Sequence, residues 1–61
     1  LVGRVEEALV EEINAHDDAF VTGRLSNNSM VHFKGDASLI GKLVKVNILE
    51  AKGFYYMGEM I

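Results

Sequence analysis

Cysteine is absent from this sequence of 61 residues, and so is any long uninterrupted run of apolar residues. Without cysteine, the chain has no disulfide bond, no thiolate ligand for a metal ion and no iron–sulfur cluster of its own. No apolar run approaches the roughly 18 residues that a membrane-spanning helix needs, and no signal-peptide pattern is present. We therefore expect no membrane association, and cysteine usage leaves the cellular compartment undetermined.

The length of the chain allows one domain, close to the lower size limit for a domain that folds around its own core. The sequence begins at Leu1 rather than at a methionine, and it ends in the apolar residues Met60 and Ile61. We therefore expect residues 1–61 to be a single domain excised from a longer protein.

The net charge of −3 is distributed unevenly along the chain. Residues 1–18 contain six acidic side chains and one basic side chain, which gives −5, whereas residues 19–58 contain five basic and two acidic side chains, which gives +3. A negative total argues against nucleic acid binding. The asymmetry nevertheless allows one positive surface, away from the acidic segment.

The middle of the chain has the pattern of a β-hairpin. Two strand-like segments, residues 19–25 and 30–33, flank the turn formers Ser-Asn-Asn-Ser. Asparagine tolerates the left-handed backbone conformation that short turns require. The segments alternate between apolar and polar side chains, so we expect one face of each strand in the core.

Two further strands are expected near the C-terminal end, over residues 43–48 and 54–57, with Gly58 ending the second. Before them, Asp36 is expected to cap one helical turn over residues 37–40. Alternation along the strands assigns a set of inward side chains. This set comprises Val31, Phe33, Val44, Val46 and Ile48.

Residues 5–13 allow two interpretations. Val5, Leu9 and Ile13 recur every four residues with glutamates between them, and this periodicity alone predicts an amphipathic helix. A strand would instead place Ala8 and Val10 on one face and Leu9 on the other. With the strand, the chain has five short strands, and closure into a small antiparallel barrel would remove exposed sheet edges.

Several short motifs, taken in order, resemble a TRAM domain, and in particular the C-terminal module of radical-SAM tRNA methylthiotransferases. The motifs are Gly3-Arg4, Leu9-Val10-Glu11, Gly23-Arg24, Asn28, Val31-His32-Phe33, Gly41-Lys42-Leu43-Val44 and Gly58-Glu59. The resemblance covers nearly the whole chain and implies an all-β, OB-like five-stranded barrel, so residues 5–13 are expected to form a strand. It also implies a cytoplasmic module that holds tRNA.

Two positions depart from the family pattern. The family often has a threonine after the Gly-Arg pair, and Leu25 stands there instead. Glu6 stands where an apolar strand residue is usual. The iron–sulfur clusters and S-adenosylmethionine of the parent enzymes are expected outside this segment, so the module is not an enzyme by itself.

The candidate RNA contacts are basic, amide and aromatic side chains near the hairpin and turns. They are Arg24, Asn27, Asn28, His32, Lys34, Lys42, Lys45, Tyr55 and Tyr56. Arginine and lysine neutralise phosphates, and an outward tyrosine stacks on a base. Gly23 beside Arg24 would allow a phosphate to approach the backbone closely, and His32, Lys34 and Lys45 would form a polar strip on one sheet surface.

Each candidate also has a structural explanation. Arg24 would simply pair with a glutamate, the two asparagines would only make the turn, and the lysines would be solubility charges. One of Tyr55 and Tyr56 should face the core, and Phe20 and Phe33 are expected there as well. The acidic side chains of residues 6–12 are expected to form a solvated face that RNA avoids.

A metal site is not expected from His16, Asp17 and Asp18, because no second cluster completes the shell. No nucleophile–base pair is recognisable either. The competing hypothesis for function is a protein-interaction barrel that docks on the catalytic domains of its own parent chain through its apolar ends. In either case the isolated domain is expected to be a monomer.

Overall fold

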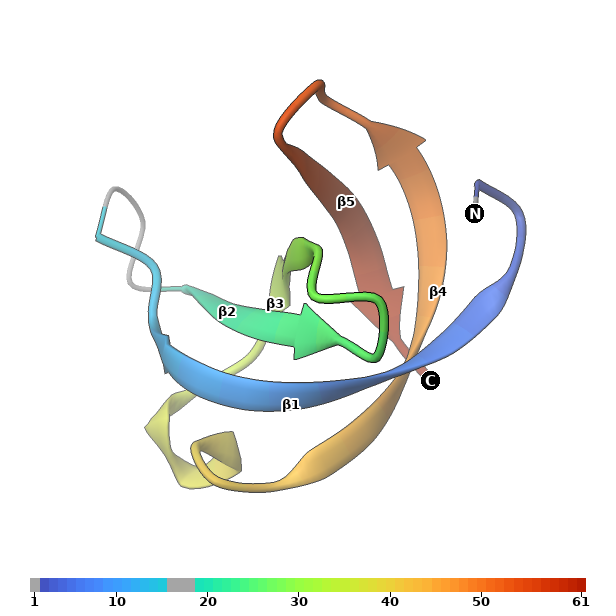
Figure 1. Ribbon diagram of the computed structural model, residues 1–61. Helices are drawn as coiled ribbons and strands as arrows, with labels where there is room; N and C mark the ends of the chain where they lie inside the picture. Colours follow the sequence, from blue (N-terminus) through green and yellow to red (C-terminus); the bar gives the residue numbers. More distant parts are fainter. Residues whose placement is uncertain (1, 16–18) are drawn as a thin grey trace.

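The computed structural model describes residues 2–15 and 19–61, and these residues form an all-β fold with five strands. The strands are β1 (Val5–Ile13), β2 (Phe20–Leu25), β3 (Met30–Lys34), β4 (Leu43–Ala51) and β5 (Tyr55–Met60). They close into a barrel in the order β1-β2-β3-β5-β4 (Figure 1). The predicted barrel is therefore confirmed.

Strand β1 closes the barrel by pairing with β2 on one side and β4 on the other. Ala8 and Val10 are fully buried, whereas Leu9 between them is exposed. The strand implied by the family resemblance is confirmed, and the helix predicted from periodicity is wrong. The partners on both sides supply hydrogen bonds along the strand, and burial follows its two-residue period.

The prediction that all pairs are antiparallel is wrong for one pair. Strands β3 and β5 run parallel, with Met30 opposite Tyr55 and His32 opposite Met57, while the other four pairs are antiparallel. An odd number of strands in a closed ring cannot alternate in direction at every step. At least one parallel pair is therefore required, and the barrel is mixed.

The core lies inside the barrel and consists of eight buried apolar side chains among the described residues. These are Ala8, Val10, Val21, Leu25, Val31, Phe33, Val46 and Ile48. Val44 and Tyr56 are partly buried and pack against this cluster. The inward faces predicted for the second hairpin strand and for β4 are therefore confirmed.

Two glycines allow close approach between elements of the barrel. Gly58 does not end β5 as predicted but lies within it, where an added Cβ would come 2.6 Å from Val46 Cγ1 and 2.7 Å from the Asn47 carbonyl oxygen. At Gly23, an added Cβ would lie 3.1 Å from Ala8 Cβ. Gly23 faces the core, which contradicts its predicted role in admitting a phosphate.

The connection from β3 to β4 contains the 3₁₀ turn η1 (Ala37–Leu39). Asp36 caps this turn, since its carboxylate accepts a hydrogen bond of 3.0 Å from the backbone N–H of Ser38. The predicted cap is confirmed. Among the described residues, no helix is long and apolar enough to cross a membrane.

Candidate nucleic-acid interface

A hollow of about 610 Å³ opens on the outer surface of β2, β3 and β5. Its lining residues come from the end of β1 and the two residues that follow it, from β2 and β3, and from β5. Its walls combine aromatic, thioether and polar side chains. They are Glu12, Asn14, Ala15, Phe20, Thr22, Met30, His32, Tyr55 and Met57.

Strand register brings these residues together. Thr22 on β2 stands opposite His32 on β3, and His32 stands opposite Met57 on β5. One step along the same face, Met30 stands opposite Tyr55. Because side chains alternate along a strand, the outward positions of the three strands form one continuous surface.

The polar part of the hollow centres on the imidazole of His32. Its Nδ1 atom lies 2.8 Å from the Thr22 hydroxyl oxygen and 3.0 Å from the Asn14 amide nitrogen. An amide nitrogen can only donate, so Nδ1 accepts the hydrogen bond from Asn14. Thr22 is only 3% exposed, so the imidazole is hydrogen-bonded to a buried hydroxyl on the neighbouring strand.

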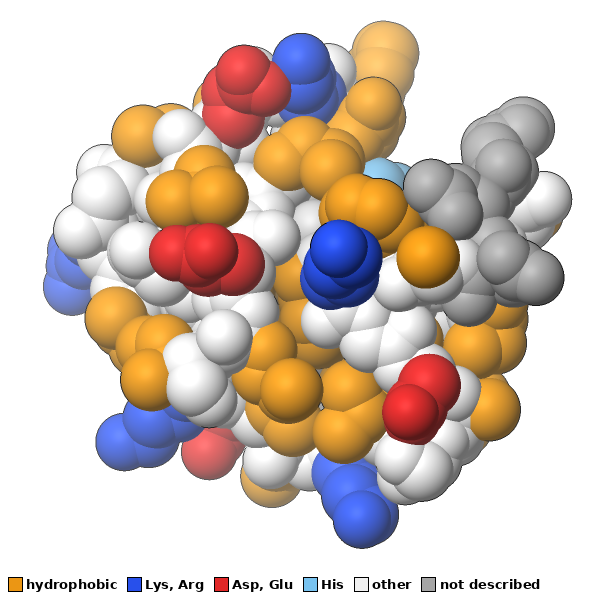
Figure 2. Space-filling view, turned by 180° about the vertical axis from the view of Figure 1, so that it is seen from behind, with side chains coloured by type: hydrophobic (Ala, Val, Ile, Leu, Met, Phe, Trp, Pro, Cys, Tyr) orange, Lys and Arg blue, Asp and Glu red, His pale blue; other side chains and the backbone are white. Residues whose placement is uncertain are grey.

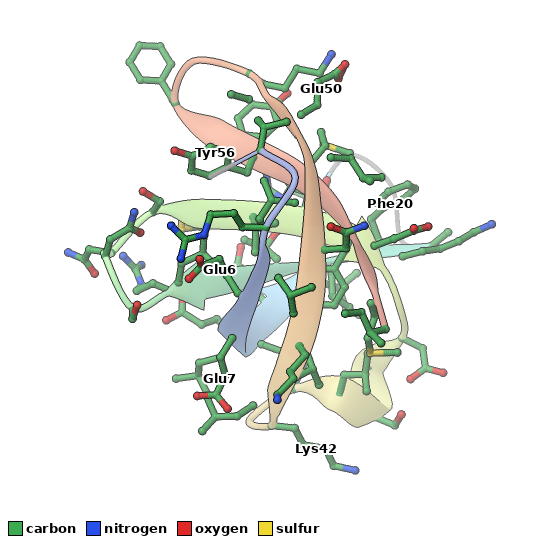
Figure 3. All side chains as sticks on the ribbon, turned by 90° about the vertical axis from the view of Figure 1, so that its right-hand side faces the viewer. Glu6, Glu7, Phe20, Lys42, Glu50 and Tyr56 are labelled. Carbon is green, nitrogen blue, oxygen red and sulfur yellow. The ribbon has the colours of Figure 1, made fainter. Side chains whose placement is uncertain are left out.

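The aromatic part of the hollow is made by Tyr55, whose ring meets His32 edge-on. The ring centroids are 4.6 Å apart and the planes are inclined at 65°. Tyr56 instead packs against the core (Figure 3). The prediction that one tyrosine faces inward and one outward is confirmed, and Tyr55 is the outward one.

Phe20 differs from its predicted place in the core. It is half-buried and lines the hollow, because it occupies an outward position of β2 while its neighbour Val21 faces the core. Phe33 is fully buried, as predicted. Phe20 therefore adds an aromatic surface to the hollow.

Arg24 is held by an acidic residue of β1. Its Nε atom donates to Glu11 Oε2 at 3.1 Å, its Nη2 atom lies 3.4 Å from Glu11 Oε1, and Nη1 donates to Asn28 Oδ1 at 3.2 Å. The hydrogen bond with Glu11, and then the charge of Glu11, raise the pKa of Arg24. A phosphate would have to share the guanidinium with this carboxylate, so phosphate contact by Arg24 stays a prediction.

The register of β1 explains this pairing. Val10 stands opposite Gly23 and Glu12 opposite Thr22, so Glu11 is an extra residue at a bulge. A bulge redirects a side chain at the point where it interrupts pairing. The Glu11 carboxylate thereby reaches the arginine of the neighbouring strand.

The two asparagines of the hairpin have structural roles. Asn27 Oδ1 accepts a hydrogen bond of 3.0 Å from the Ser29 backbone N–H. Asn28 adopts the predicted left-handed conformation, with φ of 75°. Both side chains are exposed, and their contact with RNA stays a prediction.

The three candidate lysines lie on different parts of the barrel, and all are exposed. Lys34 stands opposite Phe20, so it borders the hollow. Lys45 stands opposite Glu7 on the β1–β4 face, with β5 between its strand and β3. Lys42 precedes β4 and lies far from Tyr56 and Glu50 (Figure 3). Of the three lysines, only Lys34 thus lies on the strand that carries His32.

Charges of both signs are interspersed with apolar side chains on the face seen in Figure 2. Glu6 and Glu7 lie on the side of β4 away from Phe20 (Figure 3). Glu12, in contrast, lines the hollow, so one acidic side chain of β1 lies at this surface.

No group of three potential metal ligands gathers within residues 2–15 and 19–61. The loop residues His16, Asp17 and Asp18, weighed above as ligands, lie outside the described residues. Sequence reasoning also missed some of the hollow's residues, namely Asn14, Thr22 and Met57. The expected turn at residues 26–29 would not have found Thr22, because it pairs Leu25 with Met30 and Thr22 with Phe33. In the structure the Leu25 N–H donates to the Ser29 carbonyl, and this register sets Thr22 opposite His32.

The whole chain, residues 1–61, matches the TRAM domain family. The tRNA-2-methylthio-N(6)-dimethylallyladenosine synthase of Lachnoclostridium phytofermentans is 59% identical over 59 residues, which make up 97% of this chain. Proteins of the same name from Thermoanaerobacter sp. (strain X514) and Clostridium beijerinckii are 44% and 45% identical, over 100% and 95% of this chain. The chain spans 13% of the length of each of these relatives.

Proposed function

Since the chain belongs to the TRAM domain family, we propose that it binds RNA and holds tRNA for a methylthiotransferase whose catalytic domains lie elsewhere in the protein. The hollow on β2, β3 and β5 is the observation that carries this proposal. OB-type barrels bind oligonucleotides on the face that includes strands 2 and 3, flanked by the β1–β2 and β4–β5 loops. The hollow lies on β2 and β3, and it is also lined by Asn14 and Ala15 after β1 and by Tyr55, the first residue of β5, which supports this proposal.

Binding would combine stacking and charge neutralisation. Tyr55, fixed against His32, and Phe20 offer ring surfaces for an unpaired base. Lys34 at the border of the hollow would neutralise a phosphate, and Arg24 would do so if Glu11 releases part of its guanidinium. Asn27, Asn28, Lys42 and Lys45 are outer contacts in this proposal.

Chemistry would be supplied by the rest of the parent protein. The chain has no cysteine, so its residues do not fit an iron–sulfur cluster. The cluster and the S-adenosylmethionine implied by the family resemblance would be held by other domains. This module would position the tRNA and would supply no reacting group.

Equilibrium binding of a fluorescently labelled tRNA anticodon stem-loop, measured by anisotropy at several salt concentrations, tests the proposal. We expect a dissociation constant of about 10⁻⁴ M at physiological salt, as for largely electrostatic contacts. With about three phosphate contacts, the log–log salt slope should be near −2. Absence of binding at low salt, or an affinity that ignores salt, would favour docking on a parent chain instead.

A further inference from the structure

Three consecutive aromatic side chains, Phe54, Tyr55 and Tyr56, have three different environments. Tyr56 packs against the core, and Tyr55 lines the hollow beside His32. Phe54 is 95% exposed, the highest value among the large apolar side chains described. It lies in the β4–β5 turn and does not line the hollow.

Hydrogen bonds order the backbone of the turn that carries this ring. The Lys52 N–H donates to the Tyr55 carbonyl at 2.8 Å, and the Phe54 N–H donates to the Lys52 carbonyl at 3.2 Å. Gly53 between them has φ of +90°, a conformation that favours glycine. The next residue is Tyr55, so the turn is directly connected to the wall of the hollow. Little further ordering of the turn's backbone would therefore be needed when Phe54 meets a ligand.

The surroundings of Phe54 fit a stacked base better than a protein surface. A protein-docking patch needs contiguous apolar neighbours. Here the neighbours in the turn are Gly53 and Lys52, whose ammonium group is bound to Glu50 at 2.8 Å. A single ring suffices for a nucleobase, because stacking needs only one exposed face of the aromatic group.

We propose that Phe54 is a second stacking position, which takes an unpaired base from the same RNA segment whose neighbouring base enters the hollow. This inference rests on the proposed RNA-binding function. It assigns to the β4–β5 turn a preference for single-stranded segments, since bases within a duplex already stack on one another and offer no free face.

Tryptophan fluorescence provides a direct test, because the sequence contains no tryptophan. Phe54→Trp places a single reporter at the turn. Val5→Trp, at an exposed position opposite Asn47 on the β1–β4 face, is the matched control. The probes are an unstructured RNA oligonucleotide and a blunt RNA duplex of the same length. We expect the oligonucleotide to quench the reporter at position 54, the duplex to leave it nearly unchanged, and neither to affect the reporter at position 5.

Binding of the same oligonucleotide by Phe54→Ala and Phe54→Leu separates stacking from apolar contact. We expect both variants to bind about tenfold more weakly, with an unchanged salt slope and an unchanged melting temperature, because a stacked base is worth roughly this factor. Wild-type affinity in either variant, or binding without quenching at position 54, would overturn this inference while leaving the proposed function intact. Failure of the wild-type chain to bind RNA would instead overturn both.

Discussion

Glu11 and Arg24 form a two-point ion pair across β1 and β2, with Arg24 Nε 3.1 Å from Glu11 Oε2 and Nη2 3.4 Å from Oε1. This is the same fork geometry with which arginine binds a phosphate. Both side chains are partly exposed, so the pair contributes little to stability. Its main consequence is that an acidic side chain of the domain already occupies the guanidinium.

Glu11→Gln should therefore strengthen RNA binding. Loss of the carboxylate frees the Arg24 fork for a phosphate, so we expect affinity to rise about two- to threefold and the salt slope to steepen by about 0.7, the value of one contact. The measurement is anisotropy at several salt concentrations. Glu59→Gln is the matched control, because it makes the same charge change at an exposed residue of β5 that stands opposite Asn47 and lies neither at the hollow nor beside Arg24. Equal effects of the two substitutions would mean that only total charge matters.

Val46→Ala should destabilise the domain. Val46 is fully buried in the barrel, and its truncation removes two methyl groups from the core. We expect a loss of about 1–3 kcal/mol in the free energy of unfolding, a large fraction for so small a domain. Chemical denaturation followed by circular dichroism measures it. An unchanged midpoint would show that this residue does not face the core.

Gly58→Ala should also destabilise the domain, although it adds an atom rather than removing one. The new methyl group would lie 2.7 Å from a backbone oxygen of β4, and only a strand shift relieves that contact. Overpacking of this kind costs about 1–3 kcal/mol. The double variant Gly58→Ala/Val46→Ala relieves only the side-chain contact. Full recovery of the Val46→Ala stability in the double variant would contradict the backbone clash.

The strands and most of their faces could be predicted from the sequence, because alternation and turn chemistry are local. The direction of β5 relative to β3 could not, since it depends on where β4 inserts in the ring. The prediction that Gly58 ends its strand was wrong for a similar reason. Because Gly58 has no side chain, β5 can approach β4 closely, and a contact between two strands cannot be read from a local sequence pattern.

The candidate site was predicted only in part. His32 and an outward tyrosine, both candidates from the sequence, line the hollow, and their contact with RNA stays a prediction. Thr22 was missed, because the expected turn at residues 26–29 sets the hairpin register one residue away from the observed one. The pairing of Arg24 with Glu11 was not available, because it arises from a bulge in β1. Phe20 was assigned to the core on its apolar character, although its outward position exposes it to the hollow.

The cap at Asp36 should make stability depend on pH. Hydrogen bonds from the Ser38 side chain and backbone, together with the charge of Lys42, lower the pKa of Asp36. A folded-state pKa below the unfolded value stabilises the fold above the unfolded pKa, and this contribution is lost as pH falls through the lowered value. We expect Asp36→Ala to melt below wild type at neutral pH and to converge with it in acid. A constant difference across this range would contradict the argument.

The most direct test of RNA binding at the hollow is to map chemical-shift changes on ¹⁵N-labelled protein while an anticodon stem-loop is added. We expect the largest backbone amide shifts at Thr22, Met30, His32 and Tyr55, with little change at Val5, Asn47 and Glu59, which are paired side by side across β1, β4 and β5. Shifts confined to the β1–β4 face, or no shifts at RNA concentrations well above 10⁻⁴ M, the order expected for electrostatic contacts, would contradict it.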